Sequence, residues 1–86
     1  MAPYEVQFKA SAAKEFRKLT PDLKARIRTA ISALQQDPRP PGVKKLVGET
    51  HLYRLRVGDF RVIYEIDDAA KRLVVTRIRH RRDVYQ

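Results

Sequence analysis

Arginines recur at alternate positions in two apolar stretches of this chain, residues 52–66 and 72–79. Five of these arginines are Arg54, Arg56, Arg61, Arg77 and Arg79. A planar guanidinium donates two parallel hydrogen bonds to the oxygens of one phosphate, so residues of this type suit phosphate chemistry. Five like charges cannot neutralise one another, and their repulsion must be offset by solvent or by a bound polyanion.

The elements that must position these arginines are strands. Residues 52–66, LYRLRVGDFRVIYEI, alternate apolar and polar side chains, which predicts two strands joined by a turn at 57–59. A last strand is expected over about 72–79, where Val74, Thr76 and Ile78 alternate with Leu73, Val75, Arg77 and Arg79. The expected core face carries Tyr53, Leu55, Val62, Tyr64 and Ile78. The arginines then share the opposite face as one concave cationic patch.

The rest of the chain predicts one further strand and two helices. Residues 4–8 alternate as a strand, and Ser11 is expected to cap a helix that runs to about Leu19. Thr20-Pro21-Asp22 is a clear helix start, with an apolar stripe to about Gln36, and the prolines of 37–42 end that helix. The expected fold is a single α+β domain over residues 1–86. It has a strand, a two-helix antiparallel hairpin and three antiparallel strands, with the helices on one face of a four-stranded sheet.

Composition narrows the classes of function. Nineteen Lys and Arg against ten Asp and Glu give a net charge of +9, which favours a polyanionic partner, either nucleic acid or an acidic protein, over a merely solubilising surface. The absence of cysteine excludes disulfides, a thiol nucleophile and a Cys-based zinc site. Asp67, Asp68 and Asp83 do not have the spacing of a metal site, so neither a metal nor another cofactor is expected. No apolar run is long enough for a membrane span, and a cytoplasmic protein is expected.

Two motifs give the chain a family resemblance. Residues 53–64, YRLRVGDFRVIY, are close to the Y-R-x-R-V-G-x-Y-R-x-x-Y core of the RelE/ParE superfamily of bacterial toxins, and 80–85, HRRDVY, matches its H-R-x-x-V-Y ending. Phe8, Lys18-Leu19 and Lys44-Lys45-Leu46 fit as well. The resemblance covers nearly the whole chain.

The RelE branch implies a ribosome-dependent endoribonuclease that cuts mRNA in the ribosomal A site and so inhibits translation. In that reaction a ribose 2′-hydroxyl attacks its own 3′ phosphate. The resemblance implies that Arg54 and Arg56 match basic residues of the family, Arg61 matches the phosphate-stabilising arginine, and Arg79 matches an arginine near the leaving group. It implies that Tyr85 orients the scissile nucleotide. Further RNA-binding residues are expected to be Lys44, Lys45, Arg77, Arg81 and Arg82.

The proton acceptor is left open by the sequence. Some relatives have lysines in place of Arg54 and Arg56, and an arginine is a poor base because its pKa stays above about 12. Tyr85, His80, a ribosomal group or no protein group could take the proton. The alternative for His80 is a hydrogen bond that fixes the chain end. Glu65 falls on the arginine side by alternation, as a salt-bridge partner of Arg54 or Arg77 or as a base.

Two other activities stay open beside the nuclease. A ParE-type toxin of the same fold blocks DNA gyrase, and a nuclease-silent relative only binds an antitoxin or nucleic acid. The resemblance implies a cognate antitoxin in a toxin–antitoxin hetero-oligomer, and the charge predicts that the antitoxin wraps the toxin with an acidic segment. The ribosome and mRNA are the other expected partners, and no membrane is expected.

Overall fold

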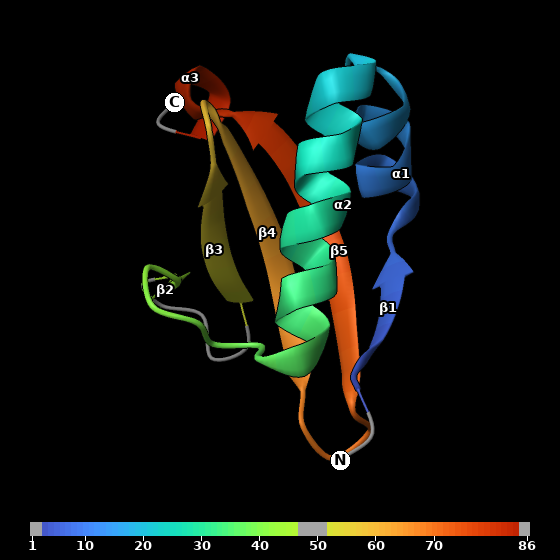
Figure 1. Ribbon diagram of the computed structural model, residues 1–86, viewed down its shortest axis with the longest axis vertical. Helices are drawn as coiled ribbons and strands as arrows, with labels where there is room; N and C mark the ends of the chain where they lie inside the picture. Colours follow the sequence, from blue (N-terminus) through green and yellow to red (C-terminus); the bar gives the residue numbers. More distant parts are fainter. Residues whose placement is uncertain (1–2, 47–51, 85–86) are drawn as a thin grey trace.

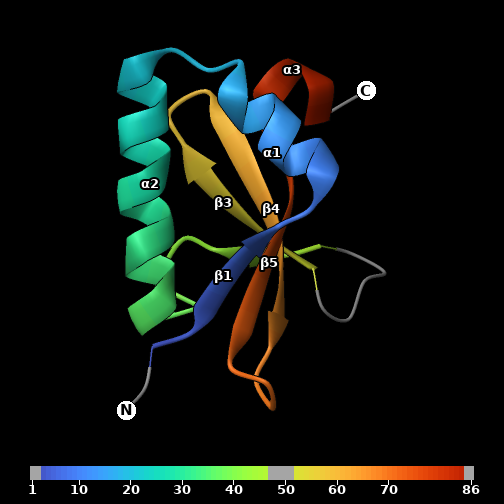
Figure 2. The same cartoon turned by 90° about the vertical axis from the view of Figure 1, so that its right-hand side faces the viewer.

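The computed structural model describes residues 3–46 and 52–84. Its elements follow the order β1 (Glu5–Phe8), α1 (Ala10–Arg17), α2 (Pro21–Gln36), β2 (Lys44–Lys45), β3 (Leu52–Val57), β4 (Phe60–Asp67), β5 (Arg72–His80) and α3 (Arg81–Val84). Figure 1 shows α2 lying across one face of the twisted sheet, with α1 beside the upper part of β5. In Figure 2, turned by 90°, α2 stands clear of the sheet on one side. The α+β fold expected from the sequence is confirmed.

The sheet has five strands in the order β1-β5-β4-β3-β2, not the four that the alternation predicts. The added strand is β2, in which Lys44 pairs with Arg54 and Lys45 with Tyr53. Two residues show no period that could reveal a strand, and β2 exists through its pairing with β3. Strand β1 runs parallel to β5, and the other pairs are antiparallel.

The start of α2 agrees with the prediction from the sequence, whereas the start of α1 does not. The Thr20 hydroxyl accepts a hydrogen bond from the Leu23 amide (3.4 Å), and Pro21 is the first residue of α2. Ser11 is not the cap of α1, because the helix already begins at Ala10 and the Ser11 hydroxyl donates to the Thr76 carbonyl oxygen (3.1 Å). The residue before α1 is Lys9, whose side chain makes no capping hydrogen bond.

The core lies between the helices and one face of the sheet. Buried side chains from the helices are Ala12, Ile27, Ile31 and Leu34. Those from the strands are Val57, Val62, Tyr64, Ile66, Leu73, Val75 and Ile78. Tyr53 and Leu55 are half-buried and pack against this cluster.

A β-bulge in β5 overturns the strict alternation expected there. Tyr64 on β4 pairs with Val75, and Ile63 pairs with Arg77, so Thr76 is the extra residue. Leu73 and Val75 therefore enter the core together with Ile78, in place of the predicted Val74 and Thr76. The arginines beyond the bulge still face away from α2.

Within residues 3–46 and 52–84, no helix is long and apolar enough to cross a membrane.

Candidate functional site

Five of the six arginines of β3, β4 and β5 lie on the sheet face opposite α2, as the alternation predicts. Strand register aligns them in two rows across the sheet. Arg56, Arg61 and Arg79 form the row nearer the β3–β4 turn, and Arg54 and Arg77 flank Ile63 in the next row. We call Arg54, Arg56, Arg61, Arg77 and Arg79 the arginine face.

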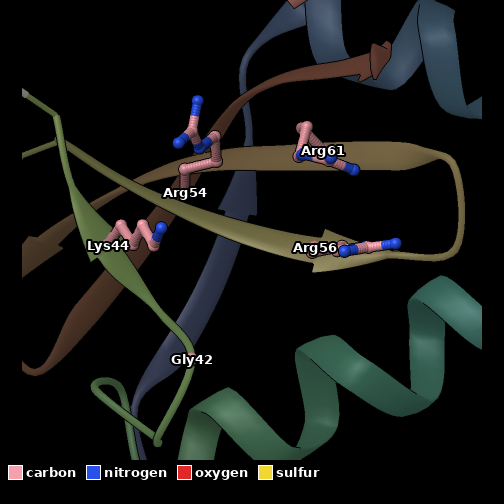
Figure 3. Close-up of a pocket in the computed structure, with 5 residues that line it drawn as sticks. All are labelled: Gly42, Lys44, Arg54, Arg56 and Arg61. Carbon is pink, nitrogen blue, oxygen red and sulfur yellow. The ribbon is translucent and has the colours of Figure 1, made fainter.

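A hollow of about 260 Å³ opens on the β3 side of this face. It is lined by Gly42, Lys44, Arg54, Arg56 and Arg61 (Figure 3). Lys44 comes from β2 and lies near Arg54, while Arg56 and Arg61 occupy the end nearer the turn. Every side chain with an ionisable group in this lining is cationic, so the hollow favours an anion.

The β3–β4 turn holds two of these arginines by its main chain. Arg61 is 8% exposed, and its Nη1 donates to the carbonyl oxygens of Phe60 (3.1 Å) and Gly58 (3.5 Å). Arg56 Nε also donates to the Gly58 oxygen (3.4 Å). Gly58 has a φ of +58°, which disfavours other residues, and a Cβ there would stand 3.2 Å from the Arg26 guanidinium of α2.

On the β5 side, a carboxylate that the sequence analysis did not single out reaches the arginine face. Glu15 Oε2 lies 3.9 Å from Arg77 Nη1 and 3.9 Å from Arg79 Nε. Its other oxygen, Oε1, accepts a hydrogen bond from the Ile78 amide (2.9 Å). Helical periodicity could not find this residue, because its role depends on where α1 packs against β5. Gly42 was missed as well, since its place in the hollow depends on the path of the chain after α2.

His80 and Glu65 are both engaged in structural contacts. His80 Nδ1 accepts a hydrogen bond from the Arg82 amide at the start of α3 (3.2 Å), and its ring packs edge-on against Phe60, with centroids 5.4 Å apart. This is the hydrogen bond expected of a residue that fixes the chain end. Glu65 forms an ion pair with Lys9, at 3.5 Å.

Three further predicted site residues, Lys45, Arg81 and Arg82, are not among the residues that line the hollow. Lys45 pairs with Tyr53, so alternation turns it to the side opposite Lys44. Arg81 lies at the β3–β4 turn, where its Nε is 3.9 Å from Asp59 Oδ1, and Arg82 is exposed on α3. Tyr85 lies outside the described residues. In the part of the chain that the structure describes, no group of three or more acidic, His or Cys residues could hold a metal ion.

Comparison with known proteins places this arrangement in a family. Residues 6–85 match the model of the ParE toxin of the type II toxin–antitoxin system parDE. The chain belongs to this toxin family. The superfamily indicated by the two sequence motifs is thereby confirmed, and the chain is a toxin of a type II toxin–antitoxin system.

Relatives within the superfamily carry RelE-type names. Toxin RelG of Mycobacterium tuberculosis is 33% identical, over 98% of this chain and 98% of its own. The RelE–RelB complex of Pyrococcus horikoshii superposes with a TM-score of 0.82 at 28% identity, covering 92% of this chain and 96% of that one. The toxin–antitoxin complex RelBE2 of M. tuberculosis gives a TM-score of 0.78 at 31% identity, covering 91% and 98%.

Proposed function

We propose that this toxin is a ribosome-dependent endoribonuclease that cleaves mRNA in the ribosomal A site and so stops translation. The observation that carries the proposal is the row of Arg56, Arg61 and Arg79 beside a cationic hollow on the sheet face opposite α2. The names of the relatives, RelG and RelE, support the same branch.

The reaction is attack of a ribose 2′-hydroxyl oxygen on the adjacent phosphorus. The new P–O bond closes a 2′,3′-cyclic phosphate, the P–O5′ bond breaks, and the leaving oxygen takes a proton to become a 5′-hydroxyl. Negative charge grows on the non-bridging oxygens of the five-coordinate phosphorus. Arg61, held in place by the turn carbonyls, and Arg56 beside it supply donors for that charge. Loss of one such donor typically costs about 10²–10³-fold in rate.

Arg79 stands across from Arg61 and is assigned to the leaving oxygen. Its guanidinium can stabilise the developing alkoxide electrostatically and donate a hydrogen bond to it. The 2′-hydroxyl proton needs a different acceptor, because an arginine holds its own proton to a pKa above about 12. Tyr85, His80 and a ribosomal group remain the candidates, with His80 Nδ1 already used by the Arg82 amide.

The proposed partner is an antitoxin with an acidic segment. The related RelE–RelB structure is a complex, and the related RelBE2 structure is a toxin–antitoxin complex. The charge of +9 favours acidic side chains on the contacting segment, because opposite charges speed encounter and fix register. An antitoxin segment of net positive charge would contradict this part of the proposal.

A second candidate function is inhibition of DNA gyrase, because the matching family model is that of the ParE toxin. Induced expression of Arg61→Ala separates the two activities. Growth arrest should disappear if the arginine row acts on RNA, and should persist with altered plasmid supercoiling if gyrase is the target. Since Arg61 is buried, Arg56→Ala serves as a second variant that does not open the core. Lys24→Ala, at a half-buried position of α2 outside the arginine face, is the charge-matched control.

A further inference from the structure

The outer edge of β5 is completed by side chains of α1. Strand β1 pairs with β5 only from Glu5–Arg72 to Phe8–Val75, and the Lys9 amide donates to the Val75 carbonyl (2.9 Å). Beyond that point the edge would be left without a strand partner. The Ser11 hydroxyl donates to the Thr76 carbonyl, and the Glu15 carboxylate accepts from the Ile78 amide (2.9 Å). Both side chains therefore stand in for a neighbouring strand.

This edge contact fixes the place of a negative charge. With Oε1 bound to the Ile78 amide, the second oxygen of Glu15 is directed at the two arginines that flank Ile78 in sequence, each at 3.9 Å. The Glu15 side chain is 26% exposed, so its charge is screened less than that of a fully solvated carboxylate. α1 lies beside this half of β5 in Figure 1.

Arg79 and Arg77 approach the Glu15 carboxylate through different nitrogen atoms of their guanidinium groups. Arg79 stands in the row with Arg61 and meets Glu15 through Nε. That leaves both terminal nitrogens of its guanidinium free of this carboxylate. Arg77 stands opposite Ile63 and meets Glu15 through a terminal nitrogen, Nη1. A contact at Nε orients a guanidinium while keeping its fork available to another anion.

We propose that Glu15 is a positioning residue for Arg79, and that it holds this arginine in the row with Arg61 against the repulsion of the neighbouring guanidinium groups. The inference rests on the proposed nuclease function, in which Arg79 serves the leaving oxygen. Glu15 itself touches neither phosphate nor ribose. Without its charge, Arg79 turns toward solvent and must be reordered at each turnover.

Glu15→Gln tests the charge separately from the edge contact, because the amide oxygen can still accept from the Ile78 amide. Glu5→Gln is the matched control, since it makes the same change on β1 beside the opposite end of β5. We expect Glu15→Gln to lower kcat for ribosome-dependent cleavage by about ten- to a hundredfold with KM nearly unchanged, and Glu5→Gln to cleave like wild type. Thermal melts of both variants report any loss of folding.

A double-mutant cycle shows through which arginine Glu15 acts. In an Arg79→Ala background, Glu15→Gln should have no further effect, whereas in an Arg77→Ala background it should keep its full effect. An equal loss of kcat in the wild-type and Arg79→Ala backgrounds would overturn the proposal, as would Glu15→Gln cleaving like wild type.

A readout that does not depend on activity separates this inference from the proposed function. The Nε–Hε resonance of Arg79 in ¹⁵N NMR spectra should shift and broaden in Glu15→Gln and stay in place in Glu5→Gln. If wild type does not cleave mRNA at all, the proposed function fails, and this resonance alone decides whether Glu15 positions Arg79. An unchanged Arg79 resonance would refute the positioning role in either case.

Discussion

Arg61 is buried and still lines the cationic hollow. A buried charge is costly unless its hydrogen bonds are satisfied, and here the carbonyl oxygens of Phe60 and Gly58 accept from Nη1. The guanidinium is thus already ordered before a phosphate arrives. Less side-chain entropy is lost on binding than for a freely rotating arginine.

A network of hydrogen bonds and one ion pair fixes the segment that leads from α2 to the hollow. Arg39 in this segment binds Asp68 through two nitrogens (Nη1–Oδ1 3.2 Å, Nη2–Oδ2 3.0 Å) and donates to the Tyr53 hydroxyl (3.2 Å). Tyr4 donates its hydroxyl hydrogen to Asp68 as well (2.5 Å), and the Tyr64 hydroxyl donates to the Pro38 carbonyl (2.7 Å). Burial raises the pKa of Tyr64, so this donor keeps its proton at neutral pH.

The Asp68 contacts predict an acid-dependent loss of stability. Hydrogen bonds from Arg39 and then Tyr4 lower the pKa of Asp68 from 3.8 to about 2. Because the folded state has the lower pKa, its contribution to stability is complete above about pH 4 and is lost as the pH falls to about 2. Asp68→Asn should therefore unfold at a lower temperature than wild type at pH 7, and the difference should largely disappear by pH 2.

Thermal melts followed by circular dichroism at pH 7, 4 and 2 measure this effect. Asp67→Asn is the control, because Asp67 is the neighbouring residue at the end of β4. Its carboxylate accepts from the Ala70 amide (3.0 Å), which an asparagine oxygen can also do. A difference between wild type and Asp68→Asn that is as large at pH 2 as at pH 7 would contradict the assignment.

The bulge in β5 allows one strand to bury apolar side chains along its first half and to carry arginines on the opposite face along its second half. Leu73, Val75, Arg77 and Arg79 are all odd-numbered, and a regular strand would put them on one face. The extra residue Thr76 reverses the alternation, and its hydroxyl donates to the Ile63 carbonyl opposite (3.1 Å). Apolar side chains before the bulge then enter the core while the arginines after it stay outside.

Alanine substitution of two neighbouring residues tests the bulge. Leu73 is 1% exposed and Val74 is half-buried, whereas regular alternation would bury Val74 instead. We expect Leu73→Ala to lower the free energy of unfolding by about 2–5 kcal/mol and Val74→Ala by less than about 1 kcal/mol. Urea unfolding midpoints measure both changes in the free energy of unfolding, provided that the m-value is the same for all variants. A larger cost for Val74→Ala than for Leu73→Ala would contradict the register.

The elements with a strong local signal could be predicted from the sequence. The β3–β4 hairpin follows from its alternation, and α2 from Thr20-Pro21 and the prolines that end it. The bulge could not be predicted, because a regular strand with Val74 and Ile78 on one face satisfies the alternation, and the extra residue appears only in the pairing of β5 with β4. Strand β2 and the roles of Ser11 and Glu15 depend on contacts between distant segments, which no local pattern encodes.

The candidate site could be predicted only in part, again because a local pattern does not encode contacts between distant segments. Alternation placed Arg54, Arg56 and Arg61 on one face, since each lies on a regular strand. Alternation also placed Arg77 and Arg79 there, on either side of the buried Ile78, and only the part of β5 before the bulge departs from the expected pattern. Burial of Arg61 depends on the turn packing around it, and no feature of the sequence distinguishes it from the exposed Arg56.

At the scale of the whole molecule, charge and its distribution govern association. The net charge of +9 predicts that binding of single-stranded RNA weakens steeply with salt, by ~0.7 in log affinity per log salt for each phosphate neutralised. Arg56→Ala should weaken binding and lower this slope by ~0.7, because it removes one contact on the arginine face. Lys24→Ala on α2 should leave the slope unchanged.

Fluorescence anisotropy with a short RNA at several KCl concentrations measures these slopes. Equal slopes for wild type and Arg56→Ala, or an equal fall in Arg56→Ala and Lys24→Ala, would mean that RNA binds by diffuse charge and not on the arginine face.

The proposed function requires that the arginine face cuts mRNA on the ribosome, and primer extension on a reporter mRNA in a reconstituted translation system detects such cuts. Wild type should produce cuts within A-site codons that vanish without ribosomes. Arg61→Lys, which keeps the charge but loses the guanidinium fork, should weaken them by about 10²–10³-fold with its melting temperature close to that of wild type. Intact mRNA with wild type, or equal cutting by well-folded Arg61→Lys, would contradict the proposed function.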